Sequence, residues 1–342
     1  MNRAFNAQMN QTIFNPGLFN LNVAEIQSIQ SKNWLVTGGA GFIGSHLVET
    51  LLLAGAKSVT VLDNLSTGFS ENISPWLQNP AFRFLEGSII DKKKVEEAMA
   101  EVDVVLHQAA LGSVPRSIKD PLATHQANVT GFITVLNAAK DVGIKRVVYA
   151  SSSSVYGDSP KLPKSETDSG KPLSPYAATK WMNEIYADIF ARTYELEIIG
   201  LRYFNIFGPR QSPNGPYAAV IPLFIERLKN GLPCEINGNG TITRDFTHVA
   251  NAVQANLKAA LIENEVAISQ VYNVACGEQL SLNDLVAILS ENLGVKIPST
   301  YREERPGDIK ASLADINKAQ NLLGYFPQVS VKSGLENLIQ FD

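Results

Sequence analysis

The chain has 342 residues, of which 45% are hydrophobic and 18% are charged. This composition is that of an ordinary globular protein, long enough for two domains or one large α/β unit, and it excludes a chain that is disordered over most of its length. The net charge is −4 and the basic residues form no block, so we expect neither nucleic acid nor an anionic membrane surface as a partner.

The cysteines and the lengths of the apolar segments indicate where in the cell the protein is expected. Cys234 and Cys276 cannot form a disulfide framework and have no CxxC spacing, and the four histidines show no metal-ligand spacing, so we predict no metal site. The most apolar stretch, residues 47–56, is far shorter than the ~20 residues that span a bilayer. Residues 1–30 lack the pattern of a signal peptide. We expect a cytoplasmic protein without a membrane span, and we interpret residues 1–30 as an N-terminal extension packed on the surface.

From Asn33 onward, short apolar runs alternate with stretches of helical periodicity. The runs WLVTG, SVTVLDN, FRFLEG, VDVVLHQAA, RVVYASS and LEIIGLRYF predict strands, and helices are predicted after Phe42 and at about 92–100, 117–141 and 175–194. Val- and Ile-rich runs spaced by helices are typical of a parallel sheet that is buried on both faces. We therefore predict a doubly wound α/β domain of the Rossmann type over residues 31–205.

The sequence changes character after about residue 205. A long loop is marked by Pro209, Pro213, Gly215 and Pro216. Helices are then predicted at 219–231 and 282–293, and the run VYNVACG predicts a short strand. We interpret residues 206–342 as mainly a smaller α/β lobe that binds substrate, with segments at about 241–275 returning to the first domain. Because open parallel sheets bind ligands at the carboxyl ends of their strands, this lobe would cap that edge.

A glycine-rich turn joins the first predicted strand to its helix. Gly38, Gly41 and Gly44 form a GxxGxxG array in WLVTGGAGFIGSHL. Such glycines let the backbone approach a pyrophosphate, and the following helix N-terminus favours negative charge. Asp63 ends the second strand about 20 residues later, where a carboxylate binds the adenosine ribose hydroxyls and repels a 2′-phosphate. The pattern predicts NAD rather than NADP; the alternative is a strand-end carboxylate that only begins a turn with Asn64.

A second pattern lies in SPYAATK. Ser174 is a predicted N-cap with Pro175 at the first helical position, and Tyr176 and Lys180 share one helix face. An ammonium group there can lower the pKa of the phenol, and a phenolate is a general base. A YxxxK alone is common on helices, where the tyrosine packs and the lysine is solvated. Residues 151–154 add serine hydroxyls at the end of RVVYA, although a serine-rich turn is an alternative interpretation.

Taken together, these motifs carry a family resemblance. TGGAGFIG, Asp63, LHQAA, Asn128, SSSSVYG, YAATK and RYFNIFGPR resemble the extended short-chain dehydrogenase/reductases that act on nucleotide sugars, over about residues 33–330. Within that family the chain most resembles UDP-hexose 4-epimerases, specifically the bacterial branch that acts on N-acetylated sugars, to which HQAALGSVPRSI and KPLSPYA are similar. The resemblance implies an isomerase of polysaccharide biosynthesis with tightly bound NAD, and a homodimer built by the helices at about 117–141 and 175–194.

The resemblance also implies roles for individual residues. Tyr176 would be the catalytic base and acid, Lys180 its electrostatic partner on the nicotinamide ribose, and Ser152, with Ser153 as the fallback, the hydroxyl that binds the 4-oxygen of the sugar. The NAD site would comprise Gly38, Gly41, Phe42, Ile43, Gly44, Asp63, Asn64, Ser88, Ile89, Gln108, Ala109, Ala110, Asn128, Tyr176, Lys180 and Tyr203. The UDP-sugar would be bound by Ser113, Ser152, Ser153, Tyr176, Asn205, Val220, Arg244, Arg305, Asp308 and Ser312.

The diphosphate end of the substrate needs cations in a chain of net negative charge. By resemblance, Arg244 and Arg305 would bind the diphosphate and Asp308 the uridine ribose. Arginine pairs with phosphate in a bidentate manner, which is the physical reason for this assignment. The alternative for each arginine is a surface ion pair with Asp245 or Glu304.

Two positions depart from patterns common in the family. Ser312 stands where members restricted to non-acetylated hexoses carry a tyrosine, so the resemblance implies room for a 2-acetamido group; the alternative is an ordinary surface serine. Ser88 replaces the carboxylate that contacts adenine. We expect the Ser88 hydroxyl or the backbone of Ile89 to take over that contact.

The residues after the catalytic hydroxyl bear on the reaction. Ser153 and Ser154 stand where nucleotide-sugar 4,6-dehydratases carry an Asp-Glu pair, so elimination would lack its acid and base. The resemblance therefore implies NAD-dependent 4-epimerisation of a UDP-N-acetylhexosamine, with UDP-Glc and UDP-Gal as further substrates, through a 4-keto intermediate. Three alternatives stay open: a 4-epimerase of UDP-N-acetylhexosaminuronic acid that uses Arg116, a net oxidoreductase, and a non-catalytic NAD-binding sensor.

Overall fold

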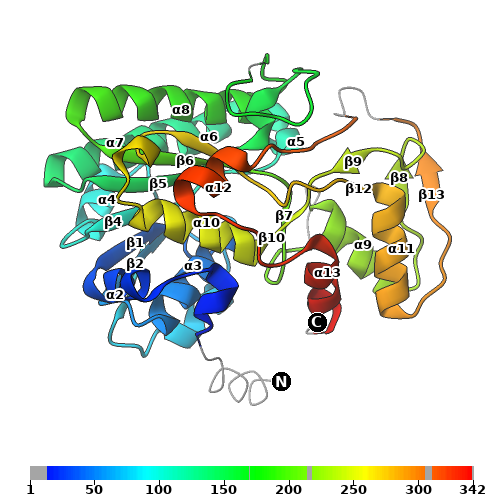
Figure 1. Ribbon diagram of the computed structural model, residues 1–342, viewed down its shortest axis with the longest axis horizontal. Coiled ribbons are helices and arrows are strands. Elements are labelled where there is room, and N and C mark those ends of the chain that lie inside the picture. The colour runs from blue at the N-terminus through cyan, green and yellow to red at the C-terminus, as the bar shows by residue number, and fades with distance from the viewer. Residues whose placement is uncertain (1–13, 169, 214–217, 305–309, 341–342) are drawn as a thin grey trace.

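The computed structural model of the chain describes residues 14–168, 170–213, 218–304 and 310–340. Seven parallel strands form one sheet in the order β11-β6-β5-β4-β1-β2-β3 (Figure 1). The strands are β1 Asn33–Thr37, β2 Ser58–Asp63, β3 Phe82–Glu86, β4 Val104–His107, β5 Arg146–Ser152, β6 Glu197–Tyr203 and β11 Val271–Val274. The strand order reverses between β1 and β4, as in a doubly wound sheet. The predicted fold class is confirmed.

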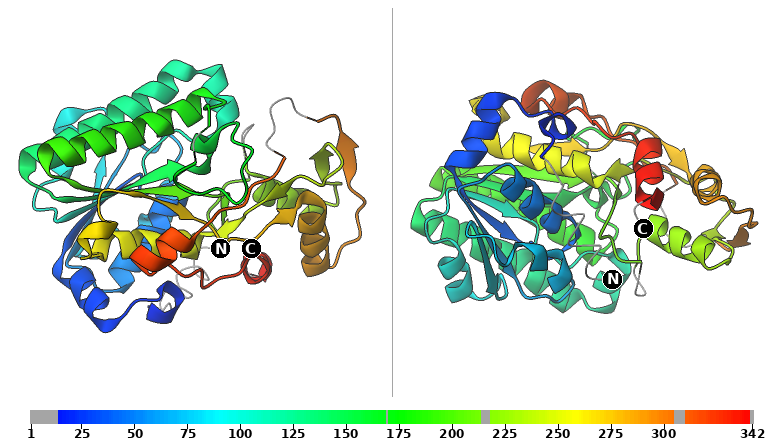
Figure 2. Two further views of the ribbon diagram at one scale, coloured as in Figure 1. Left: turned by 45° about the horizontal axis from the view of Figure 1, so that its top comes forward. Right: turned by 90° about the horizontal axis from the view of Figure 1, so that it is seen from below.

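Alternate side chains of each strand enter two separate hydrophobic layers. On β1, Trp34 and Val36 pack with helices α3 (Phe42–Leu53) and α10 (Val249–Leu261), whereas Leu35 packs with α4 (Lys92–Ala98), α7 (Gly131–Val142) and α8 (Pro175–Tyr194). Successive strand residues point to opposite faces, so helices have to cover both. In the left view of Figure 2, the green α8 lies above the sheet and the yellow α10 below it.

One predicted helix is broken into several. The sequence predicts a single helix at about 117–141, but the structure has α5 Val114–Lys119, α6 Pro121–His125, a π-helical turn η4 Gln126–Thr130, and α7. The break falls at Asp120, whose backbone is non-helical because the ring of Pro121 disfavours the helical conformation in the preceding residue. The predicted helices at 175–194 and 282–293 are confirmed as α8 and α11 (Leu282–Leu293).

Part of the N-terminal extension packs into the core. Residues Pro16–Phe19 form the 3₁₀ turn η1 and Val23–Ser31 form α2, which begins with a capping box between Asn22 and Glu25. Phe19 and Ile29 are buried in the layer that contains α10. Lys258 of α10 donates to both carboxylate oxygens of Glu25, at 2.8 and 2.9 Å. The extension therefore covers α10 on its outer side.

The C-terminal lobe has its own small core. It is built on α9 Val220–Lys229, α11 and α13 Val331–Gln340, with the paired short strands β7 Ile206–Phe207 and β10 Thr247–His248, β8 Glu235–Asn237 and β13 Thr300–Arg302, and β9 Thr243–Arg244 and β12 Leu280–Ser281. The chain crosses back to the sheet through α10, β11 and α12 (Asn317–Leu323), while α9, α11 and β13 lie to one side of it (Figure 1). Short 3₁₀ turns complete the described chain: η2 Ser70–Asn72, η3 Ser74–Trp76, η5 Ser153–Tyr156 and η6 Glu265–Ala267. No helix in the described ranges is long and apolar enough to cross a membrane.

Candidate active site

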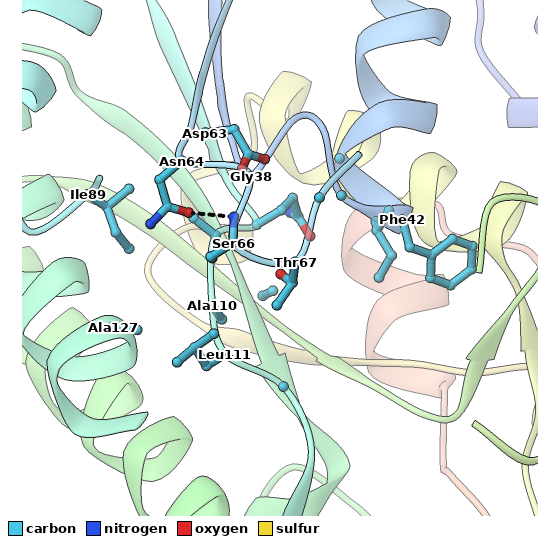
Figure 3. A pocket seen from close by; sticks show the side chains of 18 of the residues that line it. Gly38, Phe42, Asp63, Asn64, Ser66, Thr67, Ile89, Ala110, Leu111 and Ala127 are labelled. Atoms are coloured by element: carbon cyan, nitrogen blue, oxygen red, sulfur yellow. Dashed lines mark hydrogen bonds between the residues drawn. The ribbon is translucent and has the colours of Figure 1, made fainter. Parts of the chain in front are cut away.

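A cavity of about 640 Å³ lies at the carboxyl ends of the central strands. It collects most of the site residues that the sequence predicts: Gly38, Gly41, Phe42, Ile43, Gly44, Asp63, Asn64, Ser88, Ile89, Gln108, Ala109, Ala110, Ser152, Tyr176, Lys180, Tyr203 and Asn205. Figure 3 shows one end of it, where the Gly38 turn and Asp63 lie across from Ile89 and Ala110. The sheet topology accounts for this gathering, since parallel strands end at one edge.

Close packing around the glycine turn explains two of its glycines. Gly38 has a positive φ of +72°, and its N–H donates to the carbonyl of Leu62 at 2.9 Å. A Cβ atom on Gly44 would lie 2.1 Å from the carbonyl oxygen of Gly38, so helix α3 can approach the turn only with glycine there. The first turn of α3, which begins at Phe42, lines the cavity and presents N–H groups without intrahelical partners. That cradle fits a pyrophosphate.

The end of β2 supplies the carboxylate expected for an adenosine ribose. Asp63 is buried, and its two oxygens accept hydrogen bonds from the backbone N–H groups of Ala40 and Leu65, each at 2.9 Å. Burial raises the pKa of Asp63, and these backbone hydrogen bonds act in the opposite direction. Each carboxylate oxygen keeps a further lone pair for a ribose hydroxyl. Asn64 beside it accepts from the N–H of Ser66 at 3.2 Å (Figure 3).

Helix α8 and strand β5 bring the proposed catalytic groups to the same cavity. Ser174 caps α8 by accepting from the N–H of Ala177 at 3.1 Å. Lys180, which is 3% exposed, donates from Nζ to the carbonyl of Ala150 at 2.8 Å, and its Nζ lies 6.0 Å from the ring centre of Tyr176. Ser152 on β5 faces the same space. Both elements are thus tied together at the position of the predicted chemistry.

The electrostatics of this site differ from the sequence-based expectation. The sequence predicts that Lys180 lowers the pKa of Tyr176, but in the structure burial raises the pKa of Tyr176, and the opposing effect comes from a hydrogen bond with Ser152. Burial also lowers the pKa of Lys180 to about 8, against an opposing attraction from Glu184. The reason is desolvation by burial, which disfavours the charged form of both groups.

Six of the predicted site residues within the described ranges lie outside the cavity lining, and four of them are Asn128, Ser113, Val220 and Ser153. Asn128 is buried in η4, where it accepts from the N–H of Leu111 at 2.7 Å and donates to Thr179 at 3.1 Å, so it holds the 111 loop rather than a ligand directly. Ser113 caps α5 and Val220 begins α9. Ser153, the fallback for Ser152, lies in the turn η5.

The substrate lobe places two of its predicted residues side by side. The N–H of Ser312 donates to the carbonyl of Thr243 at 3.1 Å, and Nη1 of Arg244 donates to the same carbonyl at 2.9 Å. Neither residue lines the cavity. Arg305 and Asp308 lie outside the described residues.

A hydrogen-bonded triangle beside the cavity was not predicted. Asn256 of α10 donates to the phenol oxygen of Tyr203 at 2.7 Å, Tyr203 donates to Gln108 at 3.0 Å, and Gln108 donates to Asn256 at 2.9 Å. The sequence predicts Gln108 and Tyr203 as cofactor residues. Asn256 stands about fifty residues after Tyr203 in the chain and belongs to no motif. Further lining residues that sequence reasoning missed are Ser66, Thr67, Leu111, Ala123, Gln126 and Gln211. They come from loops and from the broken helical segment α6–η4, whose positions only the fold defines.

Comparisons with known proteins agree with this geometry. Residues 34–275 match the family model "NAD dependent epimerase/dehydratase family". A UDP-glucose 4-epimerase of Mycolicibacterium smegmatis is 36% identical over 310 residues, which cover 90% of this chain and 97% of that protein. A solved UDP-N-acetylglucosamine 4-epimerase of Methanobrevibacter ruminantium, in complex with UDP-N-acetylmuramic acid, is 40% identical with a TM-score of 0.85 and covers 91% of this chain and 98% of its own. A UDP-glucose 4-epimerase of Thermus thermophilus, in complex with NAD, is 34% identical with a TM-score of 0.81, at 90% and 98% coverage.

The Gly44 contact leads to a prediction about cofactor retention. In Gly44→Ala the added methyl group would meet the Gly38 carbonyl and push α3 away from the turn. Overpacking of this kind costs about 1–3 kcal/mol, so we expect about tenfold less NAD in the purified protein. Nucleotide released by denaturation measures this. Gly294→Ala carries the same added methyl with no atom within 4 Å, although its φ of +67° strains the backbone there, and it should retain wild-type NAD content because it leaves the glycine turn untouched. Equal NAD content in both variants would contradict the packing argument.

Proposed function

Because the chain belongs to the NAD dependent epimerase/dehydratase family, we propose that it interconverts the C4 epimers of a UDP-N-acetylhexosamine, UDP-GlcNAc and UDP-GalNAc. Whatever the sugar, the chain is an NAD-dependent UDP-sugar 4-epimerase, like the relatives named above. The observation that carries the proposal is the shared cavity: Tyr176, Lys180 and Ser152 line the same space as the glycine turn and Asp63. NAD supplies a hydride acceptor and donor when it is bound.

The chain's own residues would manage the proton of the sugar's 4-hydroxyl. Tyr176 lines the cavity and is partly exposed to it, and as the phenolate it can accept that proton and, as the phenol, return it. Ser152 lines the same space as Tyr176, so both hydroxyls can reach one oxygen of a bound sugar. Lys180, held by the Ala150 carbonyl, supplies positive charge that stabilises the phenolate form of Tyr176, which must be present before the sugar's proton is taken. The positive charge of oxidised nicotinamide favours the same phenolate.

The cavity lining favours epimerisation over elimination. Asp63 is the only acidic residue among the described residues that line the cavity, and it lies at the ribose end of the glycine turn. Ser153 and Ser154 occupy the turn η5 after the catalytic strand. Loss of water from a sugar needs an acid and a base in addition to the tyrosine, and the lining offers no such pair there.

The N-acetyl preference rests on the substrate lobe. Ser312 lies beside the strand that carries Arg244, so a small side chain stands next to the proposed diphosphate ligand. A Methanobrevibacter relative is named for the N-acetylated substrate. Arg116, which a uronic acid substrate would need, does not line the cavity. Interconversion of these sugars would serve polysaccharide biosynthesis.

We also propose a homodimer through one face of α8. Trp181, Met182, Ile185, Tyr186 and Ile189 form a stripe along this helix, and each is between 36% and 49% exposed. Ile118 of α5 and Leu122 of α6, which pack beside α8, are 64% and 76% exposed. A contiguous apolar face of this kind marks a protein interface, and paired helices suit a two-fold symmetric dimer.

The epimerase proposal is tested with purified protein and UDP-GlcNAc, without added cofactor. Proton NMR should show UDP-GalNAc forming until the two sugars reach equilibrium. Tyr176→Phe removes the proton acceptor and should lower kcat by about 10²–10⁴-fold while the protein keeps its NAD. Absence of conversion by the wild-type protein would refute the function, and near-normal turnover by Tyr176→Phe would refute the assigned base.

The substrate preference gives a separate prediction. Ser312→Tyr fills the space proposed for the acetamido group, so the ratio of kcat/KM for UDP-GlcNAc to that for UDP-Glc should fall by at least about tenfold. Ser312→Ala, which keeps the space, serves as the matched control and should leave the ratio unchanged. Equal losses for both sugars in Ser312→Tyr would count against the assignment.

The dimer is tested by charge on the apolar stripe. Ile185→Glu appears twice in a symmetric interface, and the buried charges should shift the protein to monomers in sedimentation velocity. Val23→Glu places the same charge on an apolar residue of α2 that is 71% exposed. This control should sediment as the wild type; a monomeric wild type would contradict the proposal.

A further inference from the structure

We propose that the buried ion pair between Glu184 and Arg202 is a positioning device for the reaction. It locks the catalytic helix α8 against the ends of β5 and β6, and the charge of Glu184 keeps Lys180 in its ammonium form. The inference rests on the proposed function, because it assigns Tyr176 and Lys180 to the reaction. It adds two residues that no cavity-lining or motif argument identifies.

The geometry of the ion pair restricts how its two side chains can move relative to each other. Arg202 donates from Nε to Oε1 of Glu184 at 2.9 Å and from Nη2 to Oε2 at 2.8 Å, a bidentate contact. The two side chains are only 8% and 9% exposed. A bidentate arginine–carboxylate contact fixes both distance and orientation. Relative motion of α8 and β6 is therefore restricted at this point.

Glu184 lies on the helix face that carries the reacting groups. Tyr176, Lys180 and Glu184 follow one another at intervals of four residues, which places them along one side of α8. Glu184 also accepts a hydrogen bond from the hydroxyl of Ser151 at 2.5 Å. Ser151 immediately precedes Ser152, and the carbonyl of Ala150 before it holds Lys180. One carboxylate thus links the catalytic helix to the strand end that presents Ser152.

Arg202 is held in turn by two other contacts. Its guanidinium lies 4.8 Å from the ring centre of Tyr156, and its Nη1 donates to the carbonyl of Glu166 at 3.1 Å. Tyr156 donates to Asn273 of β11 at 2.6 Å. Tyr203, next to Arg202 on β6, lines the cavity. These contacts fix the position of Arg202, and the ion pair between Arg202 and Glu184 fixes the position of α8 relative to β6.

The charge of Glu184 acts on Lys180 as well. Burial lowers the pKa of Lys180 and the attraction of Glu184 raises it. The charged and titratable groups around the two residues are Tyr176, Asp188 and Arg192 on α8, His107 on β4, Tyr149 on β5, Arg202 on β6 and Lys318 on α12. Among them His107 and Tyr149 are neutral near pH 7, because burial lowers the pKa of His107 to about 3 and raises that of Tyr149. Asp188 is paired with Arg192.

The experiment compares Glu184→Gln with Asp188→Asn in the NAD-loaded protein. Both remove one negative charge from α8, but the side chain of Asp188 is 62% exposed. In Glu184→Gln we expect kcat to fall by at least about tenfold with KM little changed, because the reacting groups lose their alignment. The alkaline limb of the kcat profile should move to lower pH by about one unit, since Lys180 loses its proton more easily. Asp188→Asn should change neither quantity.

A purely structural role would give a different result. Loss of rate in proportion to loss of folded protein, with the alkaline limb unmoved, would overturn the proposal, as would wild-type behaviour of Glu184→Gln. The conservative Glu184→Asp keeps the charge and should keep the wild-type pH limb even where kcat falls. If Glu184→Gln does not fold, Ser151→Ala decides: it removes the hydrogen bond to Glu184 from a residue that also lines the cavity. A several-fold fall in kcat with KM unchanged would support the positioning role. An unchanged kcat, or a change confined to KM, would overturn it.

A direct titration separates this proposal from the proposed function. Nitrogen-15 NMR of protein labelled at lysine Nζ, with the Lys180 signal assigned by Lys180→Met, gives the pKa of Lys180 without any turnover. A lower pKa in Glu184→Gln than in the wild type supports the electrostatic role, and an equal pKa contradicts it. If the wild-type protein converts no UDP-sugar, the proposed function fails while this readout still tests the Glu184 charge.

Discussion

Because β1, β4, β5 and β6 are paired in parallel register, their carboxyl ends meet at a single edge, and the rest of the site depends on that constraint. Ser152 lies opposite Tyr203 in the pairing of β5 with β6, although the two residues are far apart in the chain. The glycine turn follows β1 at the same edge. Helix α8 then needs only to be anchored against β5 for Tyr176 and Lys180 to join them.

The sequence allowed the fold class and much of the cavity to be predicted because local chemistry decides them. Gly44, Asp63 and the Tyr176–Lys180 spacing each follow a short-range rule about turns, strand ends or helix faces. Asn256 could not be predicted, since its link to Tyr203 depends on how α10 crosses the sheet. The prediction of one helix at about 117–141 misses the break at Asp120, because helical periodicity continues through it. Pro121 is the signal for the break, since proline disfavours a helical conformation in the residue before it.

Desolvation governs the ionisation of the site more strongly than the nearby positive charge does. Tyr176 and Lys180 line the cavity, and burial disfavours the charged form of each. Two largely buried ion pairs lie on opposite faces of the sheet: Glu184 with Arg202, and Glu25 with Lys258. Ionic contacts therefore fix geometry on both sides of the molecule.

The packing of the N-terminal segment has a practical side for protein engineering. A shortened gene that starts at β1 would keep every motif of the nucleotide turn, yet it would strip Phe19 and Ile29 from the outer layer and leave Lys258 without its carboxylate. Apolar surface exposed by such a truncation promotes self-association during expression. Purification tags are therefore better fused ahead of residue 14. Homologues whose sequences begin at the dinucleotide motif are poor guides for choosing where to start the expressed protein.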